Sequence, residues 1–133
     1  MGAFATYTRM QIAGNYQSGG TLASTSEVPG FNPFIANAGI SYIRNRVTVR
    51  FQYNYTDRYL ISYNQRQSLL QYTSLRRTLD IKTRYNFSRH LDFYLDVSNV
   101  FNEPDSATEF FGGRARSIKH MSPLVSFGAN ARL

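Results

Sequence analysis

Apolar and polar residues alternate with a period of two through most of the chain, which is typical of β-strands with one apolar and one polar face. The segment 46–56 shows it best, because its odd-numbered positions are Val, Val, Phe, Tyr and Tyr while its even-numbered positions are all polar. Similar runs predict strands at roughly residues 3–13, 34–44, 46–57, 77–87, 91–102 and 122–133. No helical stripe competes with them, so the predicted fold class is all-β.

The connections between these runs alternate between short and long. A two-residue turn at Asn45-Arg46 pairs Arg44 with Val47, and residues 88–90 place Tyr85 opposite Phe93. The other connections, from about 14 to 33, 57 to 77 and 103 to 123, are long. The chain therefore predicts an antiparallel up-and-down sheet with short turns at one end and long loops at the other.

The predicted strands are about ten residues long, whereas strands of soluble proteins average five or six. Long alternating strands with loops of this asymmetry are typical of a transmembrane β-barrel whose apolar face meets lipid and whose polar face lines the lumen. We therefore interpret residues 1–133 as a single partial barrel region of about six strands. The smallest single-chain barrels need eight strands, so we expect a larger barrel to complete it. Self-association of several copies and a soluble β-sheet domain remain alternatives.

Three stretches carry a resemblance to a known family: Leu79-Asp80-Ile81 followed by Tyr85, the run from Leu95 to Asn102 that contains Asp-Val-Ser-Asn-Val-Phe-Asn, and the terminal 127–133. They resemble the C-terminal barrel strands of TonB-dependent receptors of the bacterial outer membrane. The resemblance implies an integral outer-membrane location and energy-coupled uptake of a siderophore, a sugar or a similar solute. Without the family's N-terminal plug domain, the chain is not expected to transport alone.

The same resemblance implies the partners. These are outer-membrane lipid and lipopolysaccharide, a small-molecule ligand, and a TonB-type energy complex that acts through the missing N-terminal part. The outer-membrane assembly machinery would read a terminal signal that includes Val125, Phe127 and Leu133, although Leu133 replaces the family's usual terminal aromatic residue. A passive porin-like barrel piece is the alternative within membranes.

The amino-acid composition limits the kinds of chemistry and the partners to be expected of the chain. Fifteen Lys and Arg against eight Asp and Glu give a formal net charge of +7, and the chain has ten Tyr, ten Phe and no Cys. The lack of cysteine excludes disulfides and thiolate chemistry. Charge and aromatic residues together suit a nucleic-acid-binding sheet. However, single-strand binders place both on one groove, whereas here Phe51 and Arg50 lie on opposite faces, so we expect no nucleic-acid partner. A soluble β-sheet domain that binds polyanions is the alternative outside membranes.

No catalytic constellation, metal site or cofactor motif is evident, and we expect the chain not to be an enzyme. His90 and His120 fall in predicted connections, and we expect Asp80, Asp92 and Asp96 to form salt bridges with Arg and Lys on the same polar face. Ligand contacts are expected from the long outer loops. The candidate residues there are Tyr59, Tyr63, Arg66, Tyr72, Phe110 and Arg114.

Overall fold

The computed structural model describes residues 1–12, 17–18, 21–22, 25, 27–109 and 115–132. Its regular elements are β-strands apart from one 3-10 turn, η1 (Gln67–Leu69), and all strand pairings are antiparallel. No helix within these ranges is long and apolar enough to cross a membrane. The all-β prediction is confirmed.

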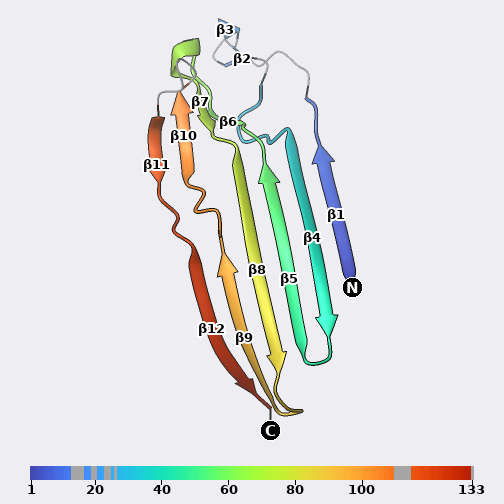
Figure 1. Ribbon diagram of the computed structural model, residues 1–133. Helices are drawn as coiled ribbons and strands as arrows, with labels where there is room; N and C mark the ends of the chain where they lie inside the picture. The colour runs from blue at the N-terminus through green and yellow to red at the C-terminus, as the bar shows by residue number, and fades with distance from the viewer. Residues whose placement is uncertain (13–16, 19–20, 23–24, 26, 110–114, 133) are drawn as a thin grey trace.

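Six long strands lie side by side in one sheet, in the order in which they occur along the chain (Figure 1). They are β1 (Gly2–Arg9), β4 (Phe34–Arg44), β5 (Val47–Thr56), β8 (Arg76–Asn86), β9 (Leu91–Ser98) and β12 (Leu124–Ala131). The sheet is open, with β1 and β12 at its edges.

The two hairpin registers agree with the prediction. Arg44 pairs with Val47 in the first hairpin, and Tyr85 pairs with Phe93 in the second. The first turn is possible because Asn45 takes a positive φ of 50°, as primed hairpin turns require and as Asn tolerates. Alternation and turn chemistry together therefore fixed which residues share a face.

The first and last predicted strands are shorter than expected. β1 ends at Arg9 rather than near residue 13, because the chain opposite it is Pro33, which accepts a bond from the Met10 N–H but has no N–H to return. β12 begins at Leu124 rather than 122, directly after Pro123. Proline marks both boundaries because it cannot donate to a ladder.

The third boundary correction concerns β9, which ends at Ser98 rather than 102. Asn99 and Asn102 both have a φ of 54°, and the Asn102 N–H donates to the Asn99 carbonyl at 2.9 Å. Left-handed backbone at two positions turns the chain out of the sheet. The remaining three strands, β4, β5 and β8, differ from their predicted ranges by one residue at each end at most.

The connections predicted as long loops contain short strands among the residues that the structure describes, which the prediction did not include. They contain a four-stranded sheet in the order β11 (Ala115–Lys119), β10 (Asp105–Glu109), β7 (Gln71–Thr73), β6 (Leu60–Ser62), and a two-stranded sheet of β2 (Gln17–Ser18) and β3 (Thr21–Leu22). We call the four-stranded sheet the outer sheet; it lies beyond the long-connection end of the six-stranded sheet (Figure 1). Its strands are only three to five residues long, which is too short for an alternating pattern to stand out in the sequence.

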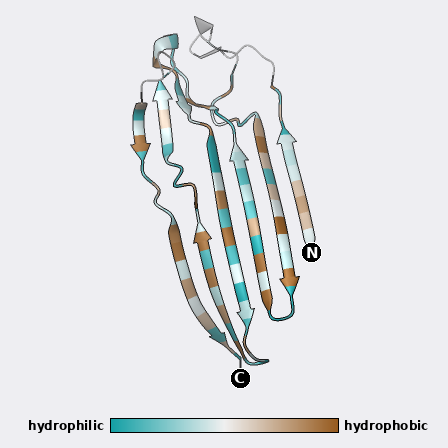
Figure 2. Ribbon diagram, in the orientation of Figure 1, coloured by the Kyte–Doolittle hydropathy of each residue, from teal (hydrophilic) through white to brown (hydrophobic). Residues whose placement is uncertain are grey.

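The six-stranded sheet is a single layer with two unlike faces. Its apolar face carries the row Ile40, Phe51, Ile81, Val97 and Val125, whose members are register partners or share that side of their strands. Figure 2 shows the resulting alternation of brown and teal bands along the strands. The apolar face is uncovered: Leu95 is 45% and Phe127 80% exposed. Among described residues the buried apolar side chains, Leu60, Leu70 and Tyr72, lie instead around the outer sheet.

Candidate functional site

The polar face is hollowed at the short-turn end of the sheet. We call this the polar hollow; its volume is about 920 Å³. It is lined by side chains of β5, β8, β9 and β12 and of the turn between β8 and β9. The lining residues are Thr48, Arg50, Lys82, Thr83, Arg84, Asn86, Ser88, Arg89, Asp92, Tyr94, Asp96, Asn130 and Arg132.

Cations dominate the lining of the polar hollow. Arg50 and Lys82 are direct cross-strand partners, so their side chains leave the same face next to each other. Lys82 in turn faces Asp96 on β9, and Arg84 faces Tyr94. Five basic and two acidic side chains line the hollow, which leaves it with an excess of three positive charges.

The expected salt bridges on this face form only in part. Arg84 Nε lies 3.5 Å from Asp92 Oδ2, and this is the one ion pair within the described ranges. The Asp92 side chain is 9% exposed and also accepts a bond from Asn130 Nδ2 at 3.0 Å. Asp96 faces Lys82 in register but makes no ion pair with it. The Asp92 carboxylate on β9 therefore binds Arg84 of β8 and Asn130 of β12, and so connects three strands.

Asp80 bonds to amides rather than to a cation. Its Oδ1 accepts the Asn99 backbone N–H at 2.9 Å, and its Oδ2 accepts Asn54 Nδ2 at 3.4 Å. Asp80 thereby holds the point where β9 leaves the sheet. The expectation of a salt bridge at Asp80 is wrong, because its carboxylate accepts a hydrogen bond from the backbone N–H of Asn99 instead.

Asn99 is the centre of this turn and is 9% exposed. Its side-chain carbonyl accepts the Glu103 N–H at 3.0 Å, and its Nδ2 donates to the carbonyls of Glu103 and Met121. One side chain thus closes the 99–103 turn and fastens the segment that leads into β12. The Asp-Val-Ser-Asn-Val-Phe-Asn run has a structural role that the sequence alone did not specify.

Aromatic rings lie over two glycines of the polar face. A Cβ added to Gly39 would come within 3.2 Å of ring atoms of Phe4, and one added to Gly128 would come within 2.8 Å of ring atoms of Tyr94. Phe4 pairs with Gly39 across β1 and β4, and Tyr94 with Gly128 across β9 and β12. Each ring covers a glycine backbone in one of the two outermost strand pairs, and at Gly128 on the edge strand β12 this is a known way in which sheets compensate for an edge glycine.

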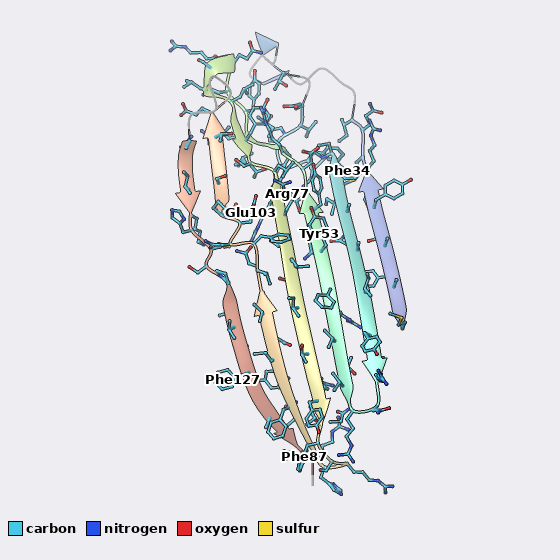
Figure 3. The ribbon with its side chains drawn as sticks, in the orientation of Figure 1. Phe34, Tyr53, Arg77, Phe87, Glu103 and Phe127 are labelled. Atoms are coloured by element: carbon cyan, nitrogen blue, oxygen red, sulfur yellow. The ribbon has the colours of Figure 1, made fainter. Side chains whose placement is uncertain are left out.

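On the apolar face, aromatic residues gather toward both strand ends. Phe34 and Tyr55 meet edge to face at the long-connection end, with ring centroids 5.5 Å apart. Phe87 and Phe93 meet similarly at the short-turn end at 6.3 Å. Figure 3 labels Phe34 and Phe87, which lie at opposite ends of the sheet. Aliphatic residues such as Ile40 and Ile81 lie between these two aromatic groups.

The structure separates the candidate ligand residues. Tyr72 is buried at 3% exposure in the cluster with Leu60 and Leu70, and Tyr63 packs against that cluster. Arg66 is exposed beside η1, and Tyr59 is partly buried. Phe110 and Arg114 lie outside the described residues. Tyr72 therefore packs the outer sheet, whereas Arg66 is free to meet a solute.

Sequence reasoning missed Arg58, whose guanidinium lies over the Tyr72 ring at 3.9 Å from its centroid. Burial, followed by the hydrogen bond and charge of Glu27, raises the pKa of Tyr72 from 10.0 to about 12, even though Arg58 acts in the opposite direction. Arg58 also lines a second, smaller cavity of about 140 Å³ with Tyr59 and Glu27. No short motif marks this group, because its members come from separate segments.

The residues of the expected assembly signal lie on an edge strand. Val125 and Phe127 of β12 are 56% and 80% exposed on the apolar face. Phe127 projects from the edge of the sheet in Figure 3. Leu133 lies outside the described residues. Both His90 and His120 are exposed, and no three His, Asp or Glu side chains gather as metal ligands within the part of the chain that the structure describes.

Comparison with known proteins gives no match: no family model, no curated protein and no solved structure is significantly similar to this chain. The features of the molecule that bear on function are the two faces of the sheet, the polar hollow and the Asn99 turn.

Proposed function

We propose that this chain is part of the wall of an outer-membrane β-barrel, namely the C-terminal part of an energy-coupled uptake receptor for a siderophore, a sugar or a similar solute. The observation that carries the proposal is the uncovered apolar face of a one-layer, six-stranded sheet. Soluble proteins rarely leave a large continuous apolar surface open to water. Lipid would cover it.

Strand length supports a membrane-spanning wall. A transmembrane β-strand needs about 9–11 residues. β4, β5 and β8 have 11, 10 and 11 residues. The aromatic residues near both ends of the apolar face suit the two interfaces of a bilayer, with the middle row of Ile40, Phe51, Ile81 and Val97 in its hydrocarbon. The polar face, with its hollow, would then line the lumen.

The sheet edges support a larger assembly. β1 and β12 each pair on one side within the described sheet, and an unpaired backbone group in hydrocarbon costs several kcal/mol. Further strands would satisfy these edges in a complete barrel. The six strands alone enclose no path, so this chain by itself is not expected to transport.

The receptor assignment is narrower and depends on the resemblance of 79–85, 95–102 and 127–133 to TonB-dependent receptors. The bonds between Asn99 and Glu103 give residues 95–102 a structural role, since they hold the turn that joins β9 to the outer sheet. In such a receptor the outer sheet faces the medium, where Tyr59, Tyr63 and Arg66 are the proposed ligand contacts. A TonB-type energy complex, a plug and the assembly machinery are the proposed partners.

The test is a charge placed on either face at nearly the same depth. Phe51→Asp puts a carboxylate on the apolar face, whereas Ser41→Asp puts one on the polar face of the neighbouring strand, opposite Arg50. We expect Phe51→Asp to abolish recovery of the protein in the outer membrane, because a charge facing hydrocarbon is costly. Ser41→Asp should be recovered like the parent protein. Equal recovery of both variants in the outer membrane would contradict the proposal.

The cationic polar hollow favours one second candidate, a soluble β-sheet domain that binds polyanions. In that case the protein would fractionate with soluble proteins, and Phe51→Asp would lower stability without changing its cellular fraction. A passive porin-like barrel would behave as the receptor does in the Phe51→Asp test, but its transport would not depend on the energy complex.

A further inference from the structure

Two neighbouring cations stand at the centre of the polar hollow. Arg50 and Lys82 are directly opposite each other across β5 and β8, so their side chains emerge from the same face. Like charges in this position destabilise a sheet. Both residues are exposed, and Arg50 Nε donates to Ser41 Oγ at 3.2 Å, which leaves the other donors of its guanidinium available.

Carboxylates of the hollow form no ion pair with Arg50 or Lys82. Asp92 is engaged by Arg84 and Asn130. Asp96 faces Lys82 from β9 but forms no ion pair with it, and it lies one strand further from Arg50. Within the described part of the chain, Arg50 and Lys82 therefore have no ionic partner.

More positive charge lies around the pair. Arg89 from the turn and Arg132 after β12 line the same hollow, and a concave wall of low dielectric concentrates the field of such a group. A sequence that breaks a pairing rule without local compensation does so most often at a functional position. A negative charge from outside the chain would compensate the excess positive charge of the hollow.

We propose that the polar hollow binds a small multivalent oxyanion, a solute with two or more phosphate or carboxylate groups. The Arg50 fork suits an oxyanion in a bidentate manner, and Lys82 supplies a point charge beside it. A volume of about 920 Å³ has room for such a solute. The proposal goes beyond the function proposed above and needs only the geometry of the polar face.

The experiment is calorimetric titration of pyrophosphate into the full chain, folded in non-ionic detergent micelles at low salt. We expect Arg50→Gln/Lys82→Gln to weaken binding about tenfold or more, because two charge-assisted contacts are lost. The matched control is Arg9→Gln/Lys119→Gln, which removes two exposed charges outside the hollow. The control should bind as the parent does, apart from a small uniform loss from the lower net charge.

A second measurement separates lost binding from lost folding. Without pyrophosphate, Arg50→Gln/Lys82→Gln should unfold at a higher urea concentration than the parent, because the repulsion is gone. Pyrophosphate should stabilise the parent and the control but not this variant. Equal binding by parent and variant, or no binding by a parent with intact β-structure, would overturn the proposal. Binding of a hexaglutamate peptide without binding of pyrophosphate would also overturn it and would indicate an acidic protein segment instead. Neither result depends on whether the chain resides in a membrane.

Discussion

Asn99 shows how much one side chain can organise. It is nearly buried, has a φ of 54° and bonds to Glu103 and Met121. We expect Asn99→Ala to lower the free energy of unfolding by about 2–4 kcal/mol, because buried amide partners lose their bonds and alanine disfavours this φ. Urea unfolding of the chain in micelles measures it.

Asn102 is the matched control for this prediction. It has the same φ of 54° but is exposed. Asn102→Ala should therefore cost only the backbone strain, about 1–2 kcal/mol. If the two substitutions cost the same, the side-chain bonds of Asn99 contribute nothing, and the proposed role of the turn in holding β12 fails.

Tyr72 carries a pH-dependent prediction. Because its pKa is raised from 10.0 to about 12, the folded state favours the neutral hydroxyl. The stability that this preference contributes is fully present below pH 10.0 and is lost as the pH rises through about 12. In an absorbance titration of the tyrosinates, Tyr72→Phe should remove a late step, whereas Tyr59→Phe should leave it. An unchanged alkaline end of the curve in Tyr72→Phe would contradict the burial of this ring.

At the residue scale, the sequence predicted which face of the sheet a side chain occupies better than which groups that side chain contacts. The alternation around Arg50 and Phe51 placed them on opposite faces correctly. It could not show that Asp80 would bond to the Asn99 backbone, because that contact depends on a left-handed residue nineteen positions away. It also could not show that Tyr72 would be buried, since a Tyr in a polar stretch carries no periodic signal.

At the scale of elements, the pair β9 and β12 offers a test of edge packing. Gly128→Ala would bring a Cβ to 2.6 Å from Tyr94 Oη, so the ring must move. We expect a loss of about 1 kcal/mol in the free energy of unfolding. In a Tyr94→Ala background the same change should be neutral or slightly stabilising, because alanine is favoured over glycine in a strand.

Gly2→Ala in β1 is the control for this double-mutant cycle, because a Cβ there meets nothing within 4 Å. It should not reduce stability. Additive effects of Gly128→Ala and Tyr94→Ala would mean that the ring does not rest on the glycine.

The hairpins were predictable because alternation and a short turn agree within one stretch of chain. The outer sheet was not, because its strands are short and pair across long separations, as β7 does with β10. Pairing of this kind is decided by the six-stranded sheet that brings the connections to one end (Figure 1). The sequence therefore predicted the six-stranded sheet but described the outer sheet only as loops.

At the scale of the whole molecule, the proposed function predicts the size and place of the native product. An antibody against β9 and β12 should detect, in outer-membrane fractions, a species several times larger than this chain, because the sheet needs further strands to close. A soluble species of the chain's own mass would instead favour the polyanion-binding domain. The same fractionation, applied to the Phe51→Asp and Ser41→Asp variants, compares their recovery in the outer-membrane and soluble fractions.

The strand directions set a parity rule for whatever completes the sheet. Five successive antiparallel pairings leave β1 and β12 pointing in opposite directions. A ring closed through these two edges stays antiparallel throughout only if strands are added in even numbers. A single added strand would force one parallel seam, which a short turn cannot connect. Loss or gain of a whole hairpin is therefore the smallest topological step open to this architecture.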